Sequence, residues 1–104
     1  MRVALHSHLL PGRELDYDRL HSGIPDALLE AHLRVGIHDW AIWRSGRSLF
    51  HIVDCKDFGQ ALRLLDMEPA NQDWQLHIRP LISHFERTHE RLELPLVWRM
   101  SEQR

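Results

Sequence analysis

The sequence predicts an α+β fold in which helices cover one face of a four-stranded antiparallel sheet. Three observations lead to this prediction. The chain has 104 residues and an ordinary globular composition, 43% hydrophobic and 27% charged, which suits a single domain over residues 1–104. Several segments either alternate polar and apolar residues or are rich in β-branched and aromatic residues, as strands are. The segments between them carry apolar residues at helical spacing.

The N-terminal third is predicted to be a strand followed by helical structure. Residues 2–10 have the two-residue period of a half-buried strand. From residue 13 the apolar spacing becomes helical and ends at Gly36. Pro25 lies inside this stretch, which leaves two alternatives. The helix kinks there, or two shorter helices meet at Ser22-Gly23 with Pro25 in the first turn of the second.

The middle of the chain is predicted to be a hairpin and a helix. Residues 37–44 and 48–54 are strand-like, and the connector between them contains Gly46, so they are expected to pair antiparallel. Asp57 is expected to cap a helix with its apolar face at Phe58, Ala61, Leu62 and Leu65.

The C-terminal part is predicted to contain one more helical segment and the last strand. Asn71 is expected to cap a helix that runs through Phe85, with a kink at Pro80. Residues 92–98 alternate in polarity, so they are expected to form the last strand with Trp98 in the core.

The resulting order, β-α-β-β-α-(α)-β, is the split βαβ or ferredoxin-like arrangement, βαββαβ. Helices shield only one side of such a sheet. Apolar residues on the opposite side therefore predict a partner, most simply a second copy that packs sheet to sheet.

Charge and cysteine content narrow the classes of partner and location. The formal net charge is −2 and the cationic residues are dispersed, which argues against nucleic acid as a partner. No apolar run approaches the ~18 residues of a membrane span. Cys55 is the sole cysteine, so no intramolecular disulfide is expected. The sequence therefore predicts a soluble, cytoplasmic protein.

Nine histidines are the oddest feature of the composition. His6 and His8 lie two apart on a predicted strand, so their rings point the same way, but no third ligand accompanies them at a recognised spacing. No metal site is therefore predicted, and the two histidines are interpreted as polar residues facing a cleft or solvent. Signatures of phosphate loops and dinucleotide sites are also missing from the sequence, and no cofactor is predicted.

Tyr17 and His21 form a more suggestive pair. Their i, i+4 spacing places both side chains on one helix face, where a phenol and an imidazole can grip one small ligand. Imidazole titrates near neutral pH and suits general acid–base catalysis. The alternative is that Tyr17 packs at the helix edge and His21 only ends the helical segment.

Two tryptophans are candidates for a sugar-binding surface. Trp40 and Trp74 adjoin Asp39 and Asp73, so their indoles could line a cleft. Packing in an ordinary core is the competing interpretation.

These residues together resemble the L-rhamnose mutarotase family, from about residue 2 to residue 98. The resemblance is carried by Tyr17-x-x-x-His21, Ile24, Leu28, Gly36, His38, Trp40-Ala41-Ile42-Trp43, Leu49-Phe50 and Asn71-Gln72-Asp73-Trp74. It implies a dimeric α+β barrel, with His21 as the proton donor and Tyr17 in contact with the sugar. Trp40 stands where the family commonly has Tyr. Asp73 and Trp74 match the family's paired tryptophans, so only the second is retained.

The predicted function is a cofactor-independent aldose mutarotase, an isomerase that interconverts the α and β anomers of L-rhamnose or a related 6-deoxy sugar. The catalytic base stays open among Asp73, His6 and His8. Two alternatives remain: a small cofactorless or haem-dependent monooxygenase of the dimeric α+β barrel type, and a non-catalytic sugar-binding module.

Overall fold

The computed structural model describes residues 1–103. Within them, strands and helices follow in the order β1 (Arg2–Leu9), α1 (Glu14–Leu20), α2 (Asp26–Arg34), β2 (Ile37–Ser45), β3 (Ser48–Cys55), α3 (Phe58–Leu65), α4 (Pro69–Ile78) and β4 (Ile82–Phe85). Short 3-10 turns lie at Arg79–Leu81 and Met100–Glu102. No helix of this part of the chain is both long enough and apolar enough to cross a membrane.

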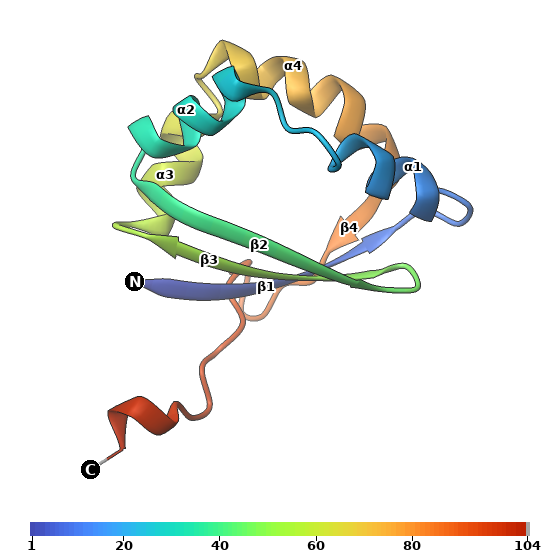
Figure 1. The fold of residues 1–104 in the computed structure, drawn as a ribbon. Coiled ribbons are helices and arrows are strands. Elements are labelled where there is room, and N and C mark those ends of the chain that lie inside the picture. The colour runs from blue at the N-terminus through green and yellow to red at the C-terminus, as the bar shows by residue number, and fades with distance from the viewer. Residues whose placement is uncertain (104) are drawn as a thin grey trace.

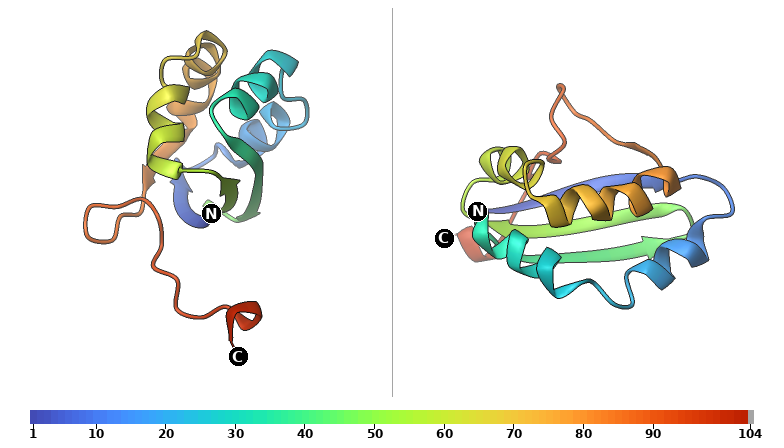
Figure 2. Two further views of the ribbon diagram at one scale, coloured as in Figure 1. Left: turned by 90° about the vertical axis from the view of Figure 1, so that its left-hand side faces the viewer. Right: turned by 90° about the horizontal axis from the view of Figure 1, so that it is seen from above.

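The four strands form one antiparallel sheet in the order β2-β3-β1-β4. All four helices lie on the same side of this sheet, and the other side is left without helices (Figures 1 and 2). This is the predicted ferredoxin-like α+β arrangement, and the prediction of the fold class is confirmed. The face under the helices is called the covered face below, and the other is called the open face.

The core fills the space between the covered face and the helices. Leu5 of β1 and Val53 of β3 pack with Phe58 of α3 in one buried cluster. Leu9 of β1 and Tyr17 of α1 belong to a second. Since burial of each large apolar side chain stabilises the fold by about 1.5–3 kcal/mol, these clusters hold α1 and α3 firmly against the sheet.

The helical stretch after β1 is two helices, as the second alternative predicted. α1 ends at Leu20 and α2 begins at Asp26, with Pro25 one residue before the helix at φ −57°. A bidentate ion pair links α1 to β2. Arg44 Nε and Nη2 on β2 lie 2.8 and 2.7 Å from the carboxylate oxygens of Asp18 on α1.

The predicted start of the third helical segment is wrong by a few residues. Asn71 is buried inside α4 and does not cap it, because the helix begins at Pro69 with Glu68 as the preceding residue. Proline suits the first helical position, where its missing N–H costs no hydrogen bond. Pro80 lies in the 3-10 turn that follows α4, so it marks the helix end and no kink.

The predicted last strand is also wrong. The fourth strand is β4, so Phe85 is a strand residue and not part of a helix. Residues 92–98 contact the sheet edge through one backbone bond, from Leu94 N–H to the Ala4 carbonyl at 2.9 Å. Trp98, predicted to be in the core, is 62% exposed, and Figure 1 shows this tail leaving the body of the protein. Alternating polarity alone does not ensure that a segment pairs with the edge of a sheet.

The cap of α3 gives a direct test of local stability. The Asp57 side chain accepts a hydrogen bond from the Gln60 backbone N–H at 3.0 Å, as predicted. Asp57→Ala should lower the free energy of unfolding by about 1 kcal/mol, measured by urea denaturation. Asp66→Ala at the other end of α3 is the matched control and should cost nothing, because a carboxylate there lies near the negative end of the helix dipole. Equal losses in both variants would contradict this reading.

Candidate active site

A group of aromatic and imidazole side chains lies on the helices that pack over the covered face. Tyr17 lies on α1, His21 directly after it, and Trp74 on α4. The ring of His21 lies 4.1 Å from that of Tyr17 and 5.3 Å from that of Trp74, centroid to centroid, with Trp74 edge-on. The structure therefore brings together three of the predicted site residues.

His21 is held by one ring nitrogen and free at the other. Its Nδ1 lies 3.0 Å from the backbone carbonyl oxygen of Tyr17. A carbonyl only accepts hydrogen bonds, so Nδ1 carries the proton and Nε2 of the neutral ring keeps its lone pair. Partial burial lowers the pKa of His21, while the Tyr17 carbonyl and Asp18 act in the opposite direction. The resting ring at neutral pH is therefore a base with its basic nitrogen available.

Tyr17 supplies a hydroxyl that stays protonated. Its side chain is buried, and desolvation, assisted by the charge of Asp18, raises the pKa of the phenol well above its ordinary value. Within residues 1–103 the hydroxyl makes no hydrogen bond. A bound ligand can therefore receive this donor without breaking an existing bond.

A second imidazole, His51 on β3, lies beneath this group in a polar network. Its Nδ1 is 3.1 Å from Trp40 Nε1, and its Nε2 is 2.9 Å from Ser7 Oγ. Because indole Nε1 only donates, Nδ1 must accept, and the proton of the neutral ring lies on Nε2, which donates to Ser7. Burial first, then the nearby His21 and His6, lowers the pKa of His51 to about 4. The ring is neutral at pH 7.

Trp40 therefore has a different setting from the other predicted site residues. Its N–H is used by His51, its ring lies edge-on to His32 at 5.9 Å, and it packs against the core cluster of Phe58. It contributes an apolar edge to the covered face rather than a free donor.

Asp73, His6 and His8 are not brought to His21. Asp73 is exposed on α4 and makes no side-chain hydrogen bond or ion pair among the described residues. His6 and His8 belong to the open face, since they alternate with the buried residues Leu5 and Ser7 along β1. None of the three lies where a base for a sugar beside His21 would be needed.

The sequence analysis missed Ser7 and His51. The available signal was a polar residue on the buried parity of each strand, Ser7 beside Leu5 and Leu9, and His51 beside Leu49 and Val53. A buried polar residue is informative because it needs a partner.

Two surface grooves of the protein lie away from His21. One is lined along α4 by Asn71, Gln75 and Arg79 among others. The other lies at the far end of β1 and is lined by His8, Leu9, Arg47, Ser48, Ser83 and His84.

Comparisons with known proteins identify a family for this chain and two proteins with a similar fold. The sequence profile of the L-rhamnose mutarotase family matches residues 2–100. An L-rhamnose mutarotase from Formosa agariphila has a similar structure, with a TM-score of 0.74 and 16% identity, covering 96% of this chain and 98% of that one. Tetracenomycin F2 cyclase from Streptomyces glaucescens, a type-II polyketide cyclase, is similar with a TM-score of 0.62 and 14% identity, covering 95% of each chain. No curated protein sequence matches this chain closely.

The neutrality of His51 has a consequence for stability. Its folded-state pKa of about 4 lies below the ordinary 6.5, so the unfolded chain binds the extra proton. The free energy of unfolding should be undiminished above pH 6.5 and should fall by on the order of 3 kcal/mol between pH 6.5 and 4 from this group. The difference from His51→Gln, measured in urea, should shrink over the same range. A His51 imidazole that titrates near pH 6.5 by NMR would contradict this prediction.

Proposed function

The chain belongs to the L-rhamnose mutarotase family, and we propose that it interconverts the α and β anomers of L-rhamnose or a related 6-deoxy sugar with His21 as the proton-transferring residue. As a member of this family it is a sugar mutarotase, an isomerase. The observation that carries the assignment of His21 is the free Nε2 of a ring anchored through Nδ1 and flanked by Tyr17 and Trp74.

The reaction needs one proton removed and one supplied. His21 Nε2 accepts the proton of the anomeric hydroxyl, the C1–O1 bond becomes a carbonyl, and the C1–O5 bond breaks. The imidazolium then gives its proton to O5, which yields the open-chain aldehyde. Rotation about C1–C2 and the reverse sequence close the ring on the other face. O1 and O5 are bonded to the same carbon, so a single imidazole can serve both in turn.

These reaction steps agree with the donor role that the resemblance implies for His21. They add the step before it, in which His21 accepts a proton. A neutral imidazole has no proton on Nε2, so it must accept one before it donates. The lowered pKa of His21 keeps the ring neutral and ready to accept. No separate base such as Asp73 is then required.

The neighbours of His21 suit a sugar. The Tyr17 hydroxyl can donate to a sugar oxygen, and the Trp74 indole offers an apolar surface. Such a surface fits a sugar whose C6 is a methyl group better than one whose C6 is a hydroxymethyl group. Trp40 supports this assignment less directly, because its N–H already bonds to His51.

We also propose a homodimer that packs through the open face. Trp43 and Phe50 lie directly opposite each other on β2 and β3, and they are 59% and 42% exposed. Leu96, Val97 and Trp98 of the tail are exposed as well. Large apolar side chains exposed side by side are characteristic of interfaces, and a second copy would cover them.

A cytoplasmic location is the last part of the proposal. Cys55 is buried and free. A free thiol and a reaction that uses a small metabolite sugar both fit a reducing compartment.

Removal of the His21 imidazole is the main test of the function. His21→Gln should slow anomer exchange by about 10²–10⁴-fold, measured by saturation-transfer NMR on L-rhamnose and other 6-deoxy sugars. His77→Gln changes an exposed histidine of α4 and should leave the rate unchanged. Exchange no faster with the protein than without it, across several 6-deoxy sugars, would overturn the proposed substrate class. An unchanged rate in His21→Gln would overturn the role of His21.

The dimer has its own test. Trp43→Glu buries a charge at the proposed interface, so it should convert the dimer to a monomer at micromolar concentration in light scattering. Leu64 on α3 is 42% exposed, the same fraction as Phe50. Leu64→Glu therefore places a charge at a residue of similar exposure away from the open face, and it should leave the dimer intact. A wild-type monomer at these concentrations would exclude the proposal.

A further inference from the structure

We propose that the open face binds a divalent transition-metal ion, of the Zn²⁺ class, through His6, His8 and Glu86. This site is separate from the sugar chemistry on the covered side of the sheet. It lies beside the proposed dimer contact, because the His6 ring stacks on Phe50 at 4.6 Å. No third ligand stands near His6 and His8 in the sequence. The fold supplies one, since Glu86 lies 78 residues after His8 and contacts it.

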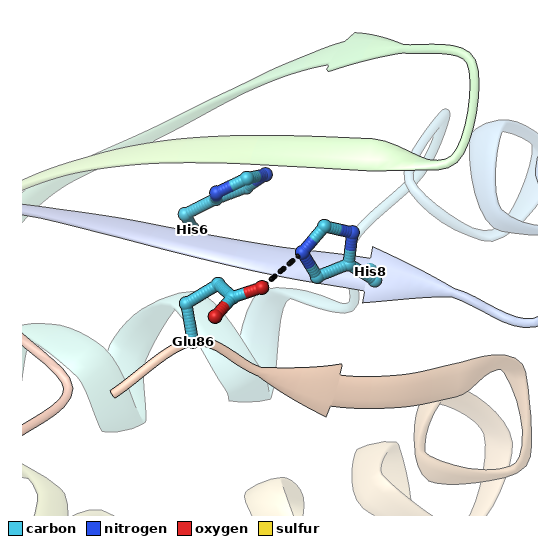
Figure 3. A group of neighbouring side chains, drawn as sticks. All are labelled: His6, His8 and Glu86. Carbon is cyan, nitrogen blue, oxygen red and sulfur yellow. Dashed lines mark hydrogen bonds and ion pairs between the residues drawn. The ribbon is translucent and has the colours of Figure 1, made fainter. Parts of the chain in front are cut away.

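The three side chains converge because of strand pairing. His6 and His8 point to the same face of β1, and their ring centroids are 4.4 Å apart. Glu86 directly follows β4, which pairs with β1, and its backbone N–H donates to the His6 carbonyl at 2.8 Å. Figure 3 shows the Glu86 carboxylate directed toward His8, with the His6 ring nearby. The backbone therefore fixes where each ligand starts.

The ligand atoms are spaced closely enough for one ion. One ligand atom from each of the three residues lies within 4.8 Å of the others, and His8 Nε2 is 2.7 Å from Glu86 Oε1. Bond lengths of about 2.0–2.2 Å to Zn²⁺ in tetrahedral geometry place ligand atoms about 3.3–3.5 Å apart. His8 and Glu86 would separate slightly and His6 would move closer. Side-chain rotations of this size need no change in the backbone.

His6 provides a separate indication of a metal ion, because its Nε2 is buried and has no hydrogen-bond partner among the described residues. An unpartnered buried polar atom is costly. A metal ion bound through this nitrogen would give it a partner.

The surroundings leave room for a fourth ligand. The His84 ring stacks on His8 at 4.6 Å, and its Nε2 lies 3.5 Å from Glu86 Oε1. A groove of about 350 Å³ adjoins His8 and His84, and it offers a path for the ion and for water. Arg47 lines the same groove, and its charge opposes a cation.

This ligand set selects the class of metal. Imidazole ligands favour Zn²⁺, Ni²⁺, Cu²⁺ or Co²⁺, whereas Mg²⁺ and Ca²⁺ prefer oxygen ligands. Only one of the three residues offers oxygen. A bound ion would tie β1 to the segment that follows β4, so it should stabilise the folded chain by mass action.

The test uses the full-length protein freed of metal and titrated with Zn²⁺ by calorimetry. Binding should be detectable, and Zn²⁺ should raise the Tm. Co²⁺ in place of Zn²⁺ should give the visible absorption of a low-symmetry site. Glu86→Gln, which keeps the size of the side chain, and His8→Ala should each weaken Zn²⁺ binding by about tenfold or more. His77→Ala removes an exposed histidine of α4 and should bind Zn²⁺ as the wild type does.

Three results would overturn the proposal: no Zn²⁺ binding by the wild type, wild-type affinity in both cluster variants, or an equal loss in His77→Ala. Circular dichroism shows whether the Glu86→Gln and His8→Ala variants are folded. If His8→Ala does not fold, Zn²⁺ binding by Glu86→Gln decides the test. His21→Gln should keep full metal affinity. The metal site and the sugar chemistry therefore succeed or fail independently.

Discussion

The structure depends on one constraint: four helices cover only one face of a four-stranded sheet. Because side chains alternate along a strand, each strand contributes to two separate environments. In β1, Leu5, Ser7 and Leu9 are buried under the helices, while His6 and His8 point to the other face. The sugar chemistry, the apolar surface proposed for a second copy and the proposed metal ligands are all placed by this division.

A buried imidazole is compatible with the covered face only because both of its nitrogens are satisfied. His51 donates to Ser7 and accepts from Trp40, and loss of either partner would leave a polar group unpaired at a cost of about 1–3 kcal/mol. The network also fixes the indole of Trp40.

The sequence was sufficient to predict the elements whose signals are local. The hairpin of β2 and β3, the cap at Asp57 and the two helices around Pro25 follow from turn and cap residues. The last strand was wrong because β4 pairs with β1 at Ser7–Leu9, while residues 92–98 reach β1 only through the bond from Leu94 to Ala4. Polarity alternation does not decide which segment pairs with β1. Tyr17, His21 and Trp74 were predicted to lie together and do so. His51 and Glu86 acquire their roles from strand pairing between distant segments, which no local pattern reveals.

The central claim is that His21 starts as a neutral base and transfers a proton through Nε2. The pH dependence of the anomer-exchange rate tests it most directly. The catalysed rate should rise with pH through an apparent pKa below 6.5, level off above it, and lose this dependence in His21→Gln. A rate that falls as pH rises through this range would rule out a neutral His21 as the starting base. So would an unchanged pH profile in the variant.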